Sequence, residues 1–336
     1  MKRSKTIVIT FAALTMLGSG QVMGQADMLP ISRTAGVLTV GLPRGKSTLM
    51  ALTNVKIVAS GTVQSAAGSV LTVATFPAAL PNLMTAPHAV KIVSRADPDG
   101  ANAYGLSASI TAQTGQDLTV ALSVLPNVGD ECVVYSLSTI ASVFGATNSA
   151  GLTAGTSSAT ADIVYLTDGG DLKGIFYKSD SAKWRQVSDP DGADQDGTVI
   201  PPGSGLLVAR KSSGAAEIFL PLRGDALPGR HVVSVSAGFT IANNPFLVPT
   251  TLGSSGLHQY LTGGSGPGTA DVLYLEQDGE LKGYFFKNAG LGGTGWRMLG
   301  DSVTNQSAVL ISPGKALLFK EQVGAASFAL PEPLAK

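Results

Sequence analysis

From about residue 36 onward, apolar residues occur in short runs rich in Val, Ile, Leu and Thr, and Gly, Asn and Asp separate one run from the next. Runs of this kind, bounded by turn-forming residues, are typical of β-strands. The 3.6-residue period of an amphipathic helix is scarce, and only short helical turns are expected, at residues 138–144 and 250–257. The pattern therefore predicts a mainly β protein.

An ordered series of segments occurs twice in the chain. Residues 161–166 (ADIVYL) return as residues 270–275 (ADVLYL), and residues 170–178 (GDLKGIFYK) return as residues 279–287 (GELKGYFFK), both pairs at the same offset. A Trp-Arg pair, a Pro-Gly corner and a further strand follow in both copies in the same order. Chance does not produce such a series, so we infer two duplicated antiparallel β modules.

Each module is expected to contain about four strands. A turn with an Asp-Gly step joins the first two strands, because it supplies the positive φ that a two-residue hairpin needs. The first module is placed at residues 137–225 and the second at residues 226–336. Matching the strand that follows the Pro-Gly corner sets Lys320 of the second copy against Arg210 of the first.

Residues 27–136 form an N-terminal β region ahead of the first module. Six short apolar runs within it predict a small barrel-like unit at about residues 56–136. Two segments before this unit, residues 38–40 and 47–50, weakly match the start of the second module. The barrel is therefore either inserted into the first module or a separate N-terminal domain, and the sequence leaves both open.

Residues 1–26 are predicted to be a secretory signal peptide. Lys2, Arg3 and Lys5 form a basic start, and the apolar run that follows is too short for a permanent membrane anchor. Small residues just after the run fit a cleavage site. We therefore expect an exported chain with no membrane span after cleavage, located in the periplasm, on the cell surface or outside the cell.

The charge balance argues against a nucleic-acid partner. Lys and Arg together number 23, as do Asp and Glu, and charged residues make up only 14% of the chain. No basic field is therefore available to hold a phosphate backbone. There is also no G-x-S-x-G motif and no metal-ligand spacing among the histidines, so we expect neither an enzyme nor a cofactor.

Two aromatic–cation pairs, Trp184-Arg185 and Trp296-Arg297, are the candidate binding residues. An exposed Trp can stack on a sugar face while Arg donates hydrogen bonds to the sugar hydroxyls. In the favoured interpretation each Trp instead fills the core of its module. Duplication supports this interpretation, because a module must rebuild its core in every copy.

An acidic loop is the best candidate for a metal site. Asp189, Asp191, Asp194 and Asp196 could offer Ca²⁺ the oxygen ligands that it takes. However, the spacing does not fit an EF-hand, and the corresponding loop at residues 301–305 lacks the carboxylates. A solvated acidic turn is therefore favoured over a calcium site.

The order of the motifs resembles a family of exported β-rich proteins. The resemblance is carried by residues 61–63 (GTV), 89–93 (AVKIV), 138–144 (STIASVF) and 200–203 (IPPG), and by the first Trp-Arg pair. This uncharacterised family has many paralogues in Verrucomicrobia and related bacteria. The resemblance implies a signal peptide and β structure, and it implies no activity and no catalytic residues.

Three classes of function remain, in order of preference. The first is an exported, non-enzymatic structural or interaction protein of the cell envelope or extracellular space. Its partners would be other envelope proteins, a second copy of itself or an extracellular polysaccharide. The second is a carbohydrate- or polymer-binding protein that uses exposed Trp and Tyr side chains. The third is an exported hydrolase with a non-local site, which requires a deep pocket with titratable groups of perturbed pKa.

Overall fold

The computed structural model describes residues 35–76, 79–94, 103–244, 246, 248–290, 292–322 and 326–330. The predicted signal peptide lies outside these residues. Strands make up 48% of the described residues and helices 4%, which confirms the prediction of a mainly β protein. The helical turns are α1 (Ile140–Phe144) and the 3₁₀ turns η1 (Leu83–Thr85) and η2 (Leu257–Gln259).

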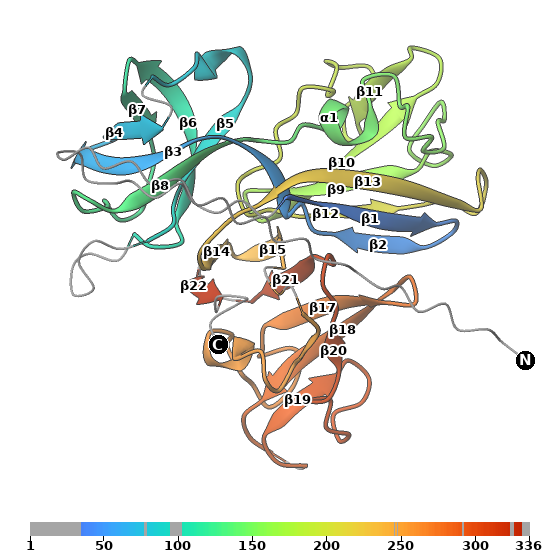
Figure 1. The fold of residues 1–336 in the computed structure, drawn as a ribbon. Coiled ribbons are helices and arrows are strands. Elements are labelled where there is room, and N and C mark those ends of the chain that lie inside the picture. Colours follow the sequence, from blue (N-terminus) through green and yellow to red (C-terminus); the bar gives the residue numbers. More distant parts are fainter. Residues whose placement is uncertain are drawn as a thin grey trace, which may run out of the picture. The chain divides into compact units, whose positions relative to one another are not determined.

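Six strands close into an antiparallel barrel (Figure 1). They are β3 (Asn54–Ala67), β4 (Val70–Phe76), β5 (His88–Ile92), β6 (Ser107–Thr114), β7 (Asp117–Val120) and β8 (Glu131–Ser136). The strand order is β3-β4-β7-β6-β5-β8, and β8 pairs back onto β3. Two irregularities of register in β3 help this long strand to curve between its two partners. The predicted barrel is thereby confirmed.

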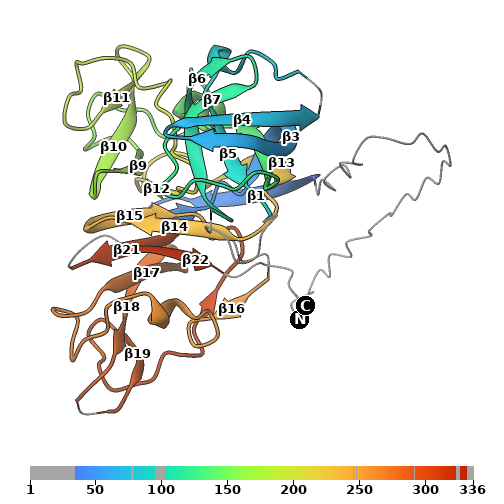
Figure 2. The same cartoon turned by 90° about the vertical axis from the view of Figure 1, so that its left-hand side faces the viewer.

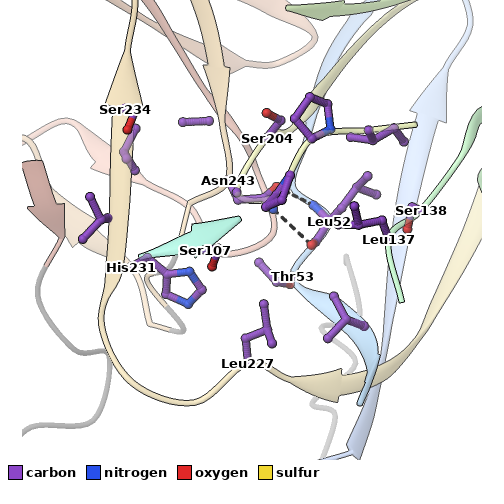
Figure 3. Close-up of a pocket in the computed structure, with 18 of the residues that line it drawn as sticks. Leu52, Thr53, Ser107, Leu137, Ser138, Ser204, Leu227, His231, Ser234 and Asn243 are labelled. Carbon is purple, nitrogen blue, oxygen red and sulfur yellow. Dashed lines mark hydrogen bonds between the residues drawn. The ribbon is translucent and has the colours of Figure 1, made fainter. Parts of the chain in front are cut away.

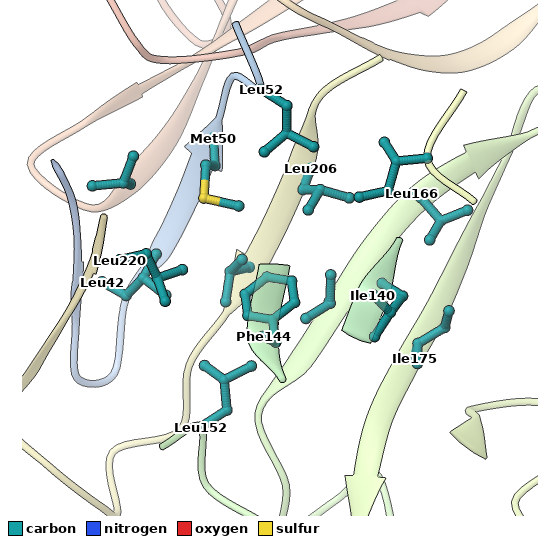
Figure 4. Close-up of a cluster of buried hydrophobic side chains, with 14 of the residues drawn as sticks. Leu42, Met50, Leu52, Ile140, Phe144, Leu152, Leu166, Ile175, Leu206 and Leu220 are labelled. Carbon is teal, nitrogen blue, oxygen red and sulfur yellow. The ribbon is translucent and has the colours of Figure 1, made fainter. Parts of the chain in front are cut away.

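The first five-stranded sheet, here called the first sheet, has the order β11-β10-β9-β12-β2. Its members are β2 (Ser47–Met50), β9 (Ile163–Asp168), β10 (Asp171–Lys178), β11 (Lys183–Gln186) and β12 (Leu206–Ala209). A two-stranded ribbon is formed by β1 (Ala35–Pro43) and β13 (Glu217–Ala226). Its inner face, α1 and one face of the first sheet together enclose a hydrophobic core (Figure 4). The Thr139 and Ser142 side chains cap α1 reciprocally.

A second five-stranded sheet, here called the second sheet, has the order β19-β18-β17-β21-β15. Its members are β15 (Gly238–Ala242), β17 (Val272–Gln277), β18 (Glu280–Lys287), β19 (Gly295–Met298) and β21 (Leu317–Glu321). Beside it, β14 (His231–Val235) pairs with β22 (Ala326–Leu330) (Figure 2). The short strands β16 (Thr250–Thr251) and β20 (Leu310–Ile311) form a further pair.

The hairpin turns of the two sheets have the backbone conformation that the sequence predicts. In the first sheet Gly169 and Gly170 join β9 to β10 with φ of 61° and 94°. In the second, Asp278 and Gly279 join β17 to β18 with φ of 54° and 77°. Positive φ at both central residues matches the right-handed twist of the paired strands, which is why Gly and Asp occur there.

Residues on either side of the barrel in the sequence share the same sheets. Strand β2 pairs with β12, and β1 pairs with β13 along its whole length. The barrel strands therefore lie, along the sequence, between β1 and β2 on one side and their partners β13 and β12 on the other. A short pairing of β13 with β3 joins the ribbon to the barrel.

The two sheets also contact each other directly. Their contact surface is formed by Leu49, Ala51, Leu207, Ile241, Ala316 and Leu318. The Gly205 N–H donates to the Ile241 carbonyl at 3.0 Å. A side chain at Gly205 would lie 2.5 Å from the Cβ of Ala316, so only glycine allows the backbones to approach this closely.

Candidate functional site

Both candidate tryptophans are buried. Trp184 has 0% and Trp296 1% of its surface exposed. The Trp184 indole packs edge-on against Tyr177, with ring centroids 5.3 Å apart, and its Nε1 donates to the Gly145 carbonyl at 2.9 Å. Trp296 packs edge-on against Phe286. The two indoles fill the core, and the alternative in which they stack on a sugar is corrected because neither presents a face to solvent.

The paired arginines point their guanidinium groups at backbone carbonyls. Arg297 is 2% exposed and donates to the carbonyls of Trp296 at 2.9 Å and Gly292 at 2.6 Å. Arg185 is half-buried and donates to the Gly192 carbonyl. The glycine-rich loop of the second copy thus encloses the Arg297 guanidinium. The donors that face these carbonyls are occupied within the chain, whereas the buried Nε groups of both arginines have no partner among the described residues. The occupied donors argue against a sugar-binding role for the two arginines.

The acidic loop divides its carboxylates among different partners. Asp191 bonds to Lys178 Nζ at 2.6 Å, and Asp194 bonds to Lys183 Nζ at 2.8 Å. The Lys178 hydrogen bond lowers the pKa of the Asp191 carboxyl. Asp189 is exposed and Asp196 is half-buried. Within the described residues no three His, Cys, Asp or Glu side chains are grouped to hold a metal, so the solvated acidic turn stays the favoured interpretation of this loop.

The three histidines lie apart, each with its own contacts. His88 Nδ1 lies 2.9 Å from the Leu83 carbonyl oxygen, in the loop before β5. The His258 ring stacks on Phe286 with centroids 4.8 Å apart. His231, at the start of β14, lies with its Nε2 3.3 Å from Lys91 Nζ. In the part of the chain that the structure describes, none of the three is hydrogen-bonded to a Ser or Asp side chain.

A cavity of about 130 Å³ lies where the barrel, residues 200–204 and the strands β14 and β15 meet (Figure 3). Its polar lining consists mainly of hydroxyl groups, contributed by Thr53, Ser107, Tyr135, Ser136, Ser138, Ser204, Ser234 and Thr240, with His231 and Asn243 beside them. Among the described residues, no Asp, Glu, Lys or Arg lines the cavity. The cavity wall is therefore polar but carries no ionised side chain when His231 is neutral.

A buried lysine holds the histidine of this cavity. Lys91 is fully buried on the outer face of the barrel strand β5, and its ammonium group lies beside His231 Nε2. Burial and this positive charge lower the pKa of His231 to about 3. The imidazole is thus neutral near pH 7, and its Nε2 faces the Lys91 ammonium group. Such a ring is a poor general base, because catalysis needs a pKa near the working pH and a free nitrogen.

One side of the cavity is fixed by a paired hydrogen bond. The Asn243 side chain accepts from the Leu52 N–H at 2.7 Å and donates to the Leu52 carbonyl at 3.1 Å (Figure 3). This contact joins the end of β15 to the segment between β2 and the barrel. No sequence motif signals the cavity, because its walls come from segments that are far apart in the chain.

The outer face of the β1–β13 ribbon carries two large apolar side chains that are exposed, next to the exposed charged side chains of Glu217 and Arg223. Val37 is 64% and Phe219 is 62% exposed, and Thr39 and Pro221 lie between them as an exposed cross-strand pair. Strand β1 is also the edge of its sheet. Antiparallel sheets normally present polar residues on the face that is turned to water. Exposed apolar side chains on the strand that ends this sheet, among the described residues, are therefore a candidate interaction surface.

Comparisons with known proteins yielded no relatives. No family model, no curated protein and no solved structure matches this chain. Among the described residues, no helix has the length and apolar character needed to cross a membrane. The geometry of the chain itself is therefore the basis for the functional proposal.

Proposed function

We propose that the mature protein is an exported, non-enzymatic interaction protein of the cell envelope or extracellular space. The observation that carries this proposal is the pair of exposed apolar side chains, Val37 and Phe219, on the outer face of the β1–β13 ribbon. Phe219 lies across from Gly41, which has no side chain to cover the ring, and Val37 lies on the same face toward the start of β1, opposite Arg223. A partner that covered this face would remove apolar surface from water, which is favourable.

The position of β1 at the edge of the described sheet supports the same proposal. Nine residues of β1 pair with β13 on one side, and β1 is the last strand of its sheet on the other. An edge strand of this length offers backbone N–H and C=O groups to an added strand, a common mode of protein recognition. Backbone pairing and apolar contact would then act on the same partner.

The rest of the molecule is consistent with a non-catalytic role. The two sheets share one strand order and matching hairpins, and we infer that they are copies of one duplicated unit. We further infer that the barrel is inserted into the first copy. The leader-like pattern of residues 1–26 supports export. The hydrolase alternative has less support because the neutral His231 already faces the Lys91 ammonium. The sugar-binding alternative through Trp lacks an exposed indole.

Site-specific photo-crosslinking in the producing bacterium tests this proposal. A photo-reactive phenylalanine analogue replaces Phe219 in the full chain with its leader, and the same analogue replaces Val303, which is 70% exposed and lies outside the ribbon. We expect a discrete crosslinked product in the envelope fraction or the medium from position 219 only. The same products from both positions, or none from position 219, would contradict the proposal.

A second variant separates the surface from the fold. Val37→Asp places a charge on the same apolar face, and since Val37 is largely exposed, the melting temperature should stay within about 2 °C. The crosslink from position 219 should nevertheless weaken strongly. An undiminished crosslink in this variant would show that the apolar face does not make the contact.

A further inference from the structure

The hydroxyl-lined cavity has the properties of a ligand site, independently of the ribbon surface. We propose that it binds a small, neutral, polyhydroxylated ligand, either a short polyol or the terminal ring of a neutral sugar. Three features of its wall support this assignment: hydrogen-bonding groups without internal partners, an absence of ionised side chains in its described lining, and apolar side chains placed among the hydroxyls.

Several hydroxyl groups in the wall have hydrogen-bonding capacity to spare. The side chains of Thr53, Ser136, Ser138 and Ser204 are half-buried, and among the described residues none of them bonds to another group. A hydroxyl both donates and accepts, so it complements a ligand hydroxyl whichever way that group turns. A convergent set of such groups matches a ligand with several hydroxyls.

Tyr135 is the most specific of these groups. It is 2% exposed, and its hydroxyl has no hydrogen bond of normal geometry within the described residues, although the Ser107 side chain lies beside it. A buried hydroxyl without a partner destabilises the fold, so native proteins rarely keep one without a reason. A ligand hydroxyl in the cavity would provide the missing partner.

The charge of the lining selects against ionic ligands. No carboxylate, lysine or arginine of the described segments lines the cavity, and the Lys91 ammonium is directed at His231 Nε2 and, at 3.5 Å, the Gly229 carbonyl. An ion that entered would lose water without gaining an opposite charge in the wall, which is unfavourable. A neutral ligand exchanges hydrogen bonds with water for hydrogen bonds with the wall.

The shape and apolar part of the wall limit the size of the ligand. Its volume of about 130 Å³ is small beside the roughly 300–1,000 Å³ of sites for drug-sized ligands. Leu52, Leu137, Ile200 and Leu227 supply apolar contacts that suit the C–H surfaces of a polyol or sugar ring. One small unit therefore fits, and a longer glycan would enter only by its end.

Ligand titration of the mature protein tests the proposal. Glycerol, xylitol and glucose serve as neutral probes, and gluconate and glucosamine serve as charged counterparts, with binding followed by saturation-transfer NMR and calorimetry. We expect saturable binding of at least one neutral probe and weaker binding of both charged probes. The proposal is overturned if no neutral probe binds saturably, which would leave a cavity that holds only water, or if a charged probe binds better.

Two matched tyrosine variants decide whether the cavity is the binding site. Tyr135→Phe removes only the unpartnered hydroxyl, so it should fold normally, with an equal or higher melting temperature, and weaken the neutral probe about tenfold, the effect of one lost hydrogen bond. Tyr165→Phe makes the same change on β9, outside the cavity, and should leave affinity unchanged. Equal affinities in Tyr135→Phe and the parent protein would overturn the assignment.

Discussion

Arg210 and Glu321 occupy corresponding positions in the two five-stranded sheets and carry opposite charges. Arg210 Nε donates to Asp162 Oδ2 at 3.2 Å, and both side chains are buried. At the matching place in the second sheet, Glu321 lies next to Asp271, and one of its carboxyl oxygens is buried without a partner. A buried ion pair in one sheet is thus replaced by a carboxyl–carboxylate pair in the other.

The strand register establishes this correspondence. In the first sheet Tyr165 pairs with Leu207, and in the second sheet Tyr274 pairs with Leu318. Arg210 lies three residues after Leu207, and Glu321 lies three residues after Leu318. The sequence comparison instead sets Lys320 against the arginine, which is wrong by one residue. A shift of one residue turns a side chain to the opposite face of the sheet, so the difference is decisive.

Glu321→Gln is expected to stabilise the protein at alkaline pH. Burial and the nearby Asp271 raise the pKa of Glu321 to about 7, so the folded chain holds this proton more tightly than the unfolded chain. Stability therefore falls as pH rises from about 4.5 through 7. The variant should gain about 1–3 kcal/mol over the parent at pH 8 and nothing at pH 4.5 in urea unfolding. Glu131→Gln, an exposed control, should show no gain at either pH.

Arg210→Met is expected to be strongly destabilising. The change leaves the Asp162 carboxylate buried without its cation, which typically costs about 3–5 kcal/mol. Arg44→Met, an exposed control, should cost less than about 0.5 kcal/mol. Adding Asp162→Asn to Arg210→Met should recover part of the loss, and a double variant as unstable as the sum of the two single variants would refute the ion-pair account.

His231 should make stability depend on pH in the opposite direction. Its pKa in the folded chain, about 3, lies below the ordinary value of 6.5, so the unfolded chain takes up the proton first as the pH falls. Its contribution is complete above pH 6.5 and is lost toward pH 3, by up to about 1.4 kcal/mol per pH unit. Between pH 4.5 and 6.5 the stability that the parent loses through His231 as the pH falls is offset by the stability that it gains through Glu321. Below pH 4.5 the gain through Glu321 ends.

Chemical denaturation of His231→Asn across pH 3 to 8 measures this contribution as a difference from the parent protein. The parent should lose stability relative to the variant as the pH falls from 6.5. His258→Asn provides the control, since this ring stacks on Phe286 elsewhere in the structure. A constant difference between parent and His231→Asn over the whole range would rule out a pKa shift of His231.

Gly205→Ala is expected to separate or strain the contact between the two sheets. An added Cβ would lie 2.5 Å from the Cβ of Ala316 and 2.9 Å from the Met50 carbonyl oxygen. Such overpacking typically costs about 1–3 kcal/mol. Gly197→Ala, where nothing lies within 4 Å of the added atom, should change stability little. Equal thermal stabilities of the two variants would show that the close approach is not needed.

Tryptophan fluorescence should report two buried indoles. Since Trp184 and Trp296 are at most 1% exposed, their emission should be blue-shifted and acrylamide should quench it poorly. Polysaccharides should leave both properties unchanged. A red-shifted, readily quenched emission that one polysaccharide protects would return the indoles to the list of binding groups.

Local features of this protein were predictable from the sequence because their causes are local. The barrel strands follow from short apolar runs, and the β17–β18 hairpin follows from the positive φ that Asp278-Gly279 adopts readily. Whether a Trp-Arg pair faces a sugar or the core depends on what packs over it. Residue type alone therefore left the role of Trp184 and Trp296 open.

The amino-acid sequence by itself determined that this is a mainly β protein and where hairpin turns such as Asp278-Gly279 lie, and it shows one series of sequence segments twice. Tertiary structure alone decided that Glu321 stands where Arg210 does, that β1 is an edge, and that Tyr135 and His231 line one cavity. The physical reason is the range of the interactions. Turn conformation and strand propensity act between neighbours in the chain, whereas strand register, burial and pKa are set by groups that only folding brings together.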